Sequence, residues 1–294
     1  MTSARSSRPS KVSLPASDTA SYRGRRIAVG TRHGKQHQFA PAFHSFLGAE
    51  LVTPTDLDTD QFGTFSGETP RPGPAVDAAR AKARLAMTVT GLPFGLASEA
   101  SYGPLPGGWH GHEEILLFCD DTRGTEVLEG HRSATVPGFS HRVAGWADTP
   151  ASLLAGLPRQ ALIVRPADPL AEAIVKGVTD TAALESAVVA AAASSRDGLA
   201  IVEPDLRAHH NPSRRQVLAR LAITMARRLA TACPRCGTPG FGRVDTEPGL
   251  PCRVCETPTS LPRSEIHACA ACAHQVARAL GKGADPALCP HCNP

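Results

Sequence analysis

The chain has 294 residues, of which 41% are hydrophobic and 20% are charged, so it can form an ordinary core and surface. No stretch approaches 18 consecutive apolar residues, and the N-terminus lacks the apolar segment of a secretory signal. We therefore expect a cytoplasmic protein with no membrane partner. Aromatic residues make up only 4%, which disfavours an aromatic stacking platform for nucleic acid.

The net charge of +4 hides regions of different charge. Residues 1–26 carry a net +5 in a segment rich in Ser, Ala and Pro, which cannot bury enough apolar surface to offset the entropy lost on ordering. We expect residues 1–25 to form a disordered basic tail. Residues 27–203 carry a net −7, whereas residues 204–230 again carry +5, along one expected helix.

The first expected strand covers residues 26–30 and leads into the short basic loop T-R-H-G-K at residues 31–35. The next stretch, through Phe39, Phe43 and Leu47, has helical spacing. In a strand, short glycine-containing loop and helix, free backbone N–H groups and a lysine can hold a phosphate group. The loop is therefore a candidate phosphate site, although it is neither a P-loop nor a dinucleotide fingerprint.

A second helix is expected over residues 74–90, with Pro74 near its start and Gly91 just after its end. The strand predicted over residues 92–98 then ends at Glu99. Open α/β sheets usually place ligand chemistry at the C-terminal ends of strands, so Glu99 is a candidate site residue.

Strands and helices continue to alternate through the rest of this region. Further strands are expected over residues 115–119, 126–128, 161–165 and 199–202, and helices over residues 150–157, 181–194 and 212–230. This alternation predicts an α/β fold with a mixed sheet and flanking helices. We expect it to form a nucleotide-binding-like domain over residues 26–230.

Two shorter patterns have both a functional and a structural interpretation. His110 and His112 could place two imidazoles on one face of a strand as metal ligands, but surface histidines are the favoured interpretation after a Pro/Gly-rich loop. In D-L-R-A-H-H-N-P at residues 205–212, Asn211 and Pro212 predict a capped helix start. The Arg and His side chains of this segment could contact an anionic ligand.

Eight of the nine cysteines form four C-x-x-C pairs near the C-terminus. The candidate metal ligands are Cys233, Cys236, Cys252, Cys255, Cys269, Cys272, Cys289 and Cys292. Two such pairs about 15–20 residues apart can close a tetrahedral zinc site. We expect residues 231–294 to form tandem zinc ribbons with two structural Zn²⁺ ions, one spanning residues 233–255 and one spanning 269–292. Spacing does not fix the connectivity, so crossed pairing remains an alternative.

A disulfide framework is the rival interpretation of these cysteines, but cytosolic thiols stay reduced. With all four positions filled by thiolates, neither zinc ion would have an open position for substrate. Each such ion carries a net −2, so the cysteine region becomes acidic and lacks the basic patch of a phosphate-binding surface. Stabilisation of the C-terminus, with a surface for a partner or a second copy, is the favoured role.

Four segments together resemble one bacterial family, which is catalogued as domain of unknown function 6671. These segments are the T-R-H-G-K loop, F-G-T-F-S-G-E-T-P-R-P-G at residues 62–73, D-L-R-A-H-H-N-P and the tandem cysteines. The resemblance extends from about Gly24 to the C-terminus, and it implies no known activity.

Residues 26–103 also resemble the inosine/xanthosine triphosphate pyrophosphatases, which carry a T-x-N-x-x-K loop, an E-N-A-x-x-K-A helix and an acidic pair after the next strand. Thr31 and Lys35 match the loop, which is one residue shorter here and has His33 in place of Asn. The helix motif is matched by D-A-A-R-A-K-A at residues 77–83, and A-S-E at residues 97–99 replaces A-D-D, with one acid missing.

This second resemblance implies a set of site roles. Thr31, His33 and Lys35 would bind phosphate, whereas Asp77, Lys82 and Glu99 would be catalytic. Asp77 and Glu99 would hold Mg²⁺ or Mn²⁺ against a triphosphate, and Lys35 and Lys82 would neutralise its growing charge. A metal-bound water would attack the α-phosphorus and release pyrophosphate.

The first functional hypothesis is thus a metal-dependent hydrolase of non-standard nucleoside triphosphates with a structural zinc-ribbon tail. It requires Lys35, Asp77, Lys82 and Glu99 to line one pocket. The alternative is a non-enzymatic zinc-ribbon adaptor that binds a protein or RNA partner through the helix from Pro212 and the basic tail. It predicts a contiguous arginine surface on that helix, and either form could oligomerise.

Overall fold

The computed structural model describes residues 21–55, 57–63, 70–104, 108, 110–134, 136, 138–171 and 173–294. The chain divides into two compact units. The N-terminal unit is Gly24–Ala226, and the cysteine unit is Arg227–Pro294. The predicted basic tail lies outside the described residues except for residues 21–25. No helix among the described residues is long and apolar enough to cross a membrane.

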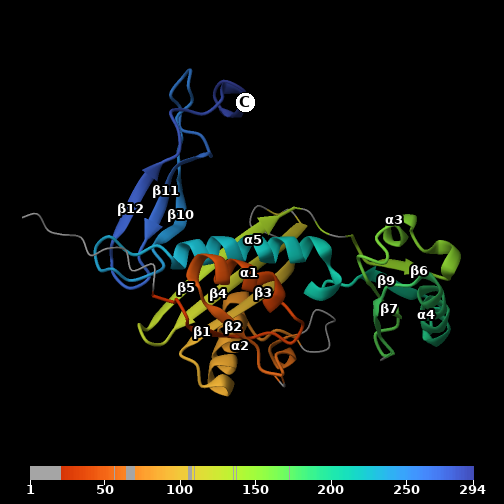
Figure 1. Ribbon diagram of the computed structural model, residues 1–294. Helices are drawn as coiled ribbons and strands as arrows, with labels where there is room; N and C mark the ends of the chain where they lie inside the picture. Colours follow the sequence, from red (N-terminus) through yellow and green to blue (C-terminus); the bar gives the residue numbers. More distant parts are fainter. Residues whose placement is uncertain are drawn as a thin grey trace, which may run out of the picture. The chain divides into compact units, whose positions relative to one another are not determined.

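The first sheet of the N-terminal unit has five strands in the order β2-β1-β3-β4-β5 (Figure 1). They are β1 (Arg26–Val29), β2 (Glu50–Val52), β3 (Phe94–Pro104), β4 (His110–Asp120) and β5 (Thr125–Ser133). β1 runs parallel to β2 and β3, whereas β4 and β5 are antiparallel. The expected mixed sheet with flanking helices is confirmed.

Helix α1 (Gln36–Leu47) connects β1 to β2, and α2 (Ala75–Thr90) packs on β1, β3 and β4. The buried face of α2 consists mainly of alanines, which lets the helix lie close to the sheet. Gly30 and Gly95 make this approach possible. A Cβ atom at Gly30 would lie 2.3 Å from the Lys82 carbonyl oxygen, and one at Gly95 would lie 2.5 Å from the Met87 sulfur. The chain leaving β1 therefore passes directly beside Lys82.

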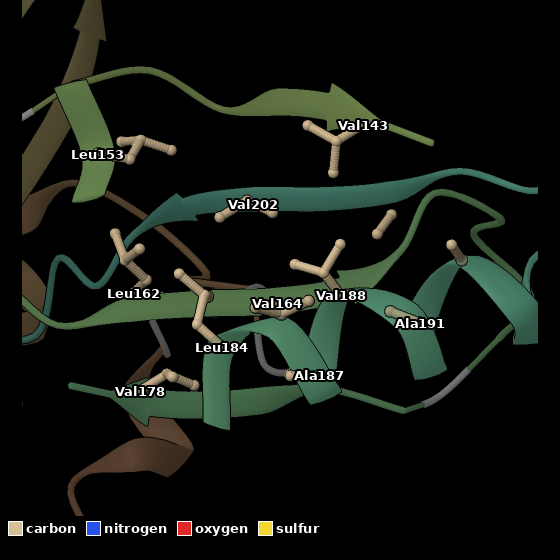
Figure 2. Packing of buried hydrophobic residues seen from close by; sticks show 12 residues of the cluster. Val143, Leu153, Leu162, Val164, Val178, Leu184, Ala187, Val188, Ala191 and Val202 are labelled. Atoms are coloured by element: carbon tan, nitrogen blue, oxygen red, sulfur yellow. The ribbon is translucent and has the colours of Figure 1, made fainter. Parts of the chain in front are cut away.

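A second sheet has four antiparallel strands in the order β6-β9-β7-β8. These are β6 (His141–Val143), β7 (Leu162–Pro166), β8 (Val175–Val178) and β9 (Ala200–Pro204), with helices α3 (Ala151–Leu154) and α4 (Thr181–Ser194). Leu184 and Val188 of α4 pack against Val164 and Val202 of the sheet (Figure 2). The region from β1 to β9 thus contains two sheets, whereas the sequence predicted one.

Helix α5 (Pro212–Leu229) follows the second sheet and begins as predicted. The Asn211 side chain caps it by accepting a hydrogen bond from the Arg214 backbone N–H at 3.0 Å. The cysteine unit then forms a three-stranded antiparallel sheet in the order β10-β11-β12. Its strands are β10 (Gly242–Pro248), β11 (Pro262–Ala268) and β12 (Gln275–Ala279).

Candidate functional site

The candidate site of the N-terminal unit lies where β1 ends. β1 pairs with β3 only as far as Val29 and Leu96, yet β3 continues to Pro104. β3 therefore extends beyond its neighbour, and the basic loop at residues 31–35 leaves the sheet at this point. Glu99 lies within β3, opposite Ile115 of β4, and not at the end of the strand as predicted.

A cavity opens here, with about 640 Å³ of free space including its part open to solvent. Its lining is strongly cationic, with six Lys or Arg side chains and two carboxylates. The lining residues are Gly30, Thr31, Arg32, His33, Lys35, Thr59, Asp60, Gly63, Lys82, Glu99, Lys176, Arg207, Ala208 and Arg214. The whole sequence has five lysines, and three of them line this one cavity. Such a lining favours an anionic ligand.

Lys35 reaches from the loop to β3 and donates hydrogen bonds to two uncharged oxygens of Ser98. The Lys35 Nζ atom lies 3.1 Å from the Ser98 carbonyl oxygen and 2.9 Å from Ser98 Oγ. Removal of this ammonium group from water, together with the nearby positive charge of Arg214, lowers the pKa of Lys35 to about 8. The Lys35 ammonium group therefore loses its proton at a lower pH than that of an exposed lysine.

Lys82 and Glu99 form a buried ion pair, with 2.6 Å between Lys82 Nζ and Glu99 Oε2. Arg71 Nη1 lies 3.7 Å from the other carboxylate oxygen, so Glu99 faces two cations. A divalent cation needs carboxylate oxygens that are free to coordinate it. Glu99 is committed to Lys82 and Arg71, and Asp60 pairs with Arg32 at 2.7 Å. The cavity as built therefore does not fit Mg²⁺ or Mn²⁺.

The remaining predicted residues are divided between the cavity and the surface. Thr31 is buried in the lining, and its Oγ1 accepts a hydrogen bond from the His33 backbone N–H at 3.3 Å. Asp77 is not among the residues that line the cavity. It lies near the exposed start of α2, where its carboxylate pairs with Arg80 at 2.6 Å. The structure therefore does not bring Asp77 into the cavity with Glu99, because its position on α2 turns it toward solvent, and its catalytic role stays a prediction.

The far wall of the cavity comes from later parts of the chain. Arg207 forms a hydrogen-bonded ion pair with the buried carboxylate of Asp205, at 2.6 Å for the shortest contact. This fixed guanidinium lies in the segment for which an anionic ligand was considered. Sequence analysis did not select Lys176 of β8 or Arg214 of α5. Lys176 belongs to no recognisable sequence motif, and Arg214 is one of several arginines in a basic helix. Their sequence context therefore did not mark either residue as part of a site.

Arg214 is fully buried and binds Glu114 of β4, with Nε 2.6 Å from Oε2 and Nη2 3.1 Å from Oε1. Burial alone would raise the pKa of Glu114, but Arg214 and the hydrogen bond to His112 outweigh it and lower the pKa to about 2. His112 is itself buried and stacks on Tyr102, with 4.5 Å between the ring centroids. The expectation of a surface histidine is wrong for His112, because β4 begins earlier than predicted and carries it into the sheet.

The cysteines form two groups of four in the cysteine unit, and the pairing is the crossed one. Within each group the sulfur atoms all lie within 4.8 Å of one another. The first and third C-x-x-C pairs form one group, Cys233, Cys236, Cys269 and Cys272, and the second and fourth form the other, Cys252, Cys255, Cys289 and Cys292. The predicted sequential ribbons are therefore wrong in their connectivity.

The sheet explains this crossing. In the antiparallel pair of β10 and β11, Gly242 lies opposite Ala268, so the pair before β10 meets the pair after β11. At the other end Ser264 of β11 lies opposite Ala279 of β12, which brings the second and fourth pairs together. A strand of seven residues spans about 20 Å, so consecutive pairs lie at opposite ends of the sheet.

The sulfur positions suit tetrahedral zinc. Neighbouring sulfur atoms in these groups are 3.4–3.9 Å apart, close to the edge of about 3.8 Å implied by Zn–S distances of about 2.3 Å. A hydrogen bond with Thr238 lowers the pKa of Cys236 to about 6, and Thr257 does the same for Cys255. Burial raises the pKa of Cys269 to about 12, and the contact with Cys255 raises that of Cys292 to about 12. Each group thus contains one thiol that is shifted toward the thiolate form that binds metal. Each group could therefore bind one zinc ion.

Comparison with known proteins adds a family. Searches of curated proteins and of solved structures found no match. The family described as a domain of unknown function (DUF6671) matches residues 82–294, which include Lys82, Glu99, the far wall of the cavity and all eight clustered cysteines. The chain belongs to the DUF6671 family.

Proposed function

We propose that the cavity binds a nucleotide through its phosphate groups. The observation that carries this proposal is the concentration of six cationic side chains, including three of the five lysines, around one cavity at the end of β1. Phosphate oxygens accept charge-assisted hydrogen bonds from Lys and Arg, and these are stronger than neutral ones.

Each wall would contribute differently to phosphate binding. The loop at residues 31–35 supplies Lys35, whose ammonium group is already oriented by Ser98. Arg207 is held in place by Asp205, so its guanidinium would lose little further freedom on binding. Lys176 lies on β8, is partly exposed and adds a further cation to the lining of the cavity. Together these groups would hold a phosphate chain between the two sheets.

Hydrolysis of a non-standard nucleoside triphosphate, which the pyrophosphatase resemblance implies, is a narrower claim. It requires a divalent cation, and Glu99 is paired with Lys82 while Asp77 lies elsewhere. We therefore propose nucleotide binding as the function and derive no step through a metal ion.

The adaptor hypothesis predicts a contiguous arginine surface on α5. Arg214 is instead buried against Glu114, and Arg215 donates a hydrogen bond to the His209 carbonyl oxygen at 2.7 Å. In the first turn of the helix Arg214 is thus buried within the protein, and Arg215 is engaged by a backbone carbonyl oxygen. This arrangement favours the nucleotide proposal over a protein or RNA partner at α5.

Equilibrium dialysis of the full chain against standard and deaminated nucleoside triphosphates tests the proposal. We expect Lys176→Ala to weaken binding about tenfold, which corresponds to the loss of one charge-assisted contact of about 1.4 kcal/mol. Lys282→Ala removes an exposed lysine of the cysteine unit and serves as the matched control. No binding to any nucleotide, or equal weakening by both variants, would overturn the proposal. Pyrophosphate release measured with added Mg²⁺ would show whether hydrolysis accompanies binding.

We further propose that the two cysteine groups bind two structural zinc ions. The tetrahedral sulfur spacing supports this, and the cysteine unit has few other means of stabilisation because most of β10 and all of β12 are exposed. Elemental analysis of the purified chain should give two zinc ions per chain. Removal of zinc with a chelator should unfold the three-stranded sheet, and a folded, metal-free sheet would refute this role.

A further inference from the structure

We propose that Lys35 is a reactive amine that forms an imine with the carbonyl group of a phosphorylated aldehyde bound in the cavity. This inference rests on the proposed anion-binding role of the cavity, and it adds a covalent chemistry that phosphate binding alone does not require.

The hydrogen bonds of Lys35 orient its nitrogen for attack. A neutral primary amine has two N–H donors and one lone pair. The Ser98 carbonyl oxygen can only accept a hydrogen bond, and Ser98 Oγ is a second acceptor on the same residue. When both N–H groups of the neutral amine are bound to Ser98, its lone pair takes no part in these hydrogen bonds. Since Lys35 lines the cavity, a ligand held there can meet this lone pair.

Burial is the main reason why the neutral amine of Lys35 forms more readily than that of an exposed lysine. Burial and the positive charges of Arg214 and Lys82 outweigh the Glu114 and Glu99 carboxylates and lower the pKa of Lys35 to about 8. A lysine that is desolvated or next to another cation is a recognised kind of activated nucleophile. Lys82 has a different setting, because its Nζ atom is paired with the Glu99 carboxylate at 2.6 Å. The cavity therefore contains one lysine paired with a carboxylate and one whose hydrogen bonds go to uncharged oxygens.

The ligand class follows from the two halves of the site. Arg207 and the other cations of the wall suit a phosphate group, whereas Lys35 suits a carbonyl carbon. The Lys35 lone pair attacks that carbon, a C–N bond forms, and the carbonyl π electrons move to oxygen. The oxygen takes up the proton that nitrogen loses, and the resulting carbinolamine expels water to give the imine. The balance is one amine and one aldehyde to one imine and one water, with no change in oxidation state.

Pyridoxal 5′-phosphate is a suitable probe because it combines an aldehyde with a phosphate group. The full chain would be incubated with this probe at pH 8, reduced with borohydride and mapped by peptide mass spectrometry. With only five lysines in the chain, every candidate site can be quantified. We expect Lys35 to be labelled at least tenfold more than the exposed Lys282, and inorganic phosphate to suppress the difference. Lys35→Arg should lose the adduct, whereas Lys282→Arg should leave it unchanged.

The outcomes separate this inference from the proposed function. Labelling of Lys35 no greater than that of Lys282, or labelling mainly at Lys82 or Lys176, would overturn the reactive-amine assignment even if nucleotides bind. Equal labelling of Lys35 by pyridoxal without its phosphate would overturn the phosphorylated ligand class and weigh against phosphate binding. Because the main measurement uses the wild-type chain, it does not depend on the folding of any variant.

Discussion

The buried pair of Glu114 and Arg214 joins β4 to α5 and provides the sharpest prediction for the N-terminal unit. Both side chains are almost completely excluded from water, at 0% and 1% exposure. Replacing Arg214 by Met removes one charge and leaves the Glu114 carboxylate buried without its main counter-ion. Breaking a buried pair in this way typically costs about 3–5 kcal/mol.

The pKa of Glu114 gives an independent magnitude. Its lowering from 4.5 to about 2 corresponds to roughly 3 kcal/mol of stabilisation of the folded state, at about 1.4 kcal/mol for each factor of ten in proton affinity. Because the folded-state pKa is lowered, this contribution is complete above pH 4.5 and is lost as the pH falls toward 2. The two routes therefore agree on about 3 kcal/mol at pH 7.

The assay is urea unfolding followed by hydrogen exchange of peptides from β4, which reports the first sheet separately from the second. The neighbouring exposed pair, Arg132 and Glu113 at 2.7 Å, supplies the control. We expect Arg214→Met to lower the free energy of unfolding by about 3 kcal/mol at pH 7 and Arg132→Met to lower it by less than about 1 kcal/mol. The deficit of Arg214→Met should shrink on acidification to pH 3. A deficit below 1 kcal/mol, or one independent of pH, would refute the reasoning.

Three further predictions concern the cysteine unit and the cavity. The Cys233→Ser/Cys269→Ser double variant should lose one zinc ion and Cys233→Ser/Cys252→Ser should lose both, as measured by elemental analysis; the reverse result would restore sequential pairing. Glu256, directly after the second C-x-x-C pair, has a left-handed φ of 60°, and Gly237, directly after the first pair, has a φ of 75°. Glu256→Gly should therefore raise stability by about 1 kcal/mol in thermal unfolding, and Gly237→Glu should lower it; no gain in the first variant would contradict the strain argument. Because the pKa of Lys35 is lowered to about 8, nucleotide affinity should fall as the pH rises from 7 to 9, and this loss should be absent in Lys35→Arg. Dialysis across this pH range checks the point, and a flat wild-type profile would count against a role for Lys35.

Local sequence patterns determined most of the elements by themselves. Helix α4 spans residues 181–194 as predicted, and α5 begins at Pro212 because Asn211 provides the cap. The four C-x-x-C pairs likewise marked the cysteines that could hold a metal ion, since two thiols three residues apart can converge on one point. These features depend on neighbours in the chain, which is why the sequence alone sufficed.

Tertiary structure decided which of these features meet. The crossed pairing of cysteines follows from the register of the antiparallel strands, and the spacing of the cysteines in the sequence does not predict that register. Short strands such as β2 and β8 exist because they pair with longer neighbours, so their own residues gave little signal. The cavity depends most completely on tertiary structure. Lys35, Glu99 and Arg207 come from a loop, a strand interior and a distant segment, and only the packing of the two sheets places their charges around one space.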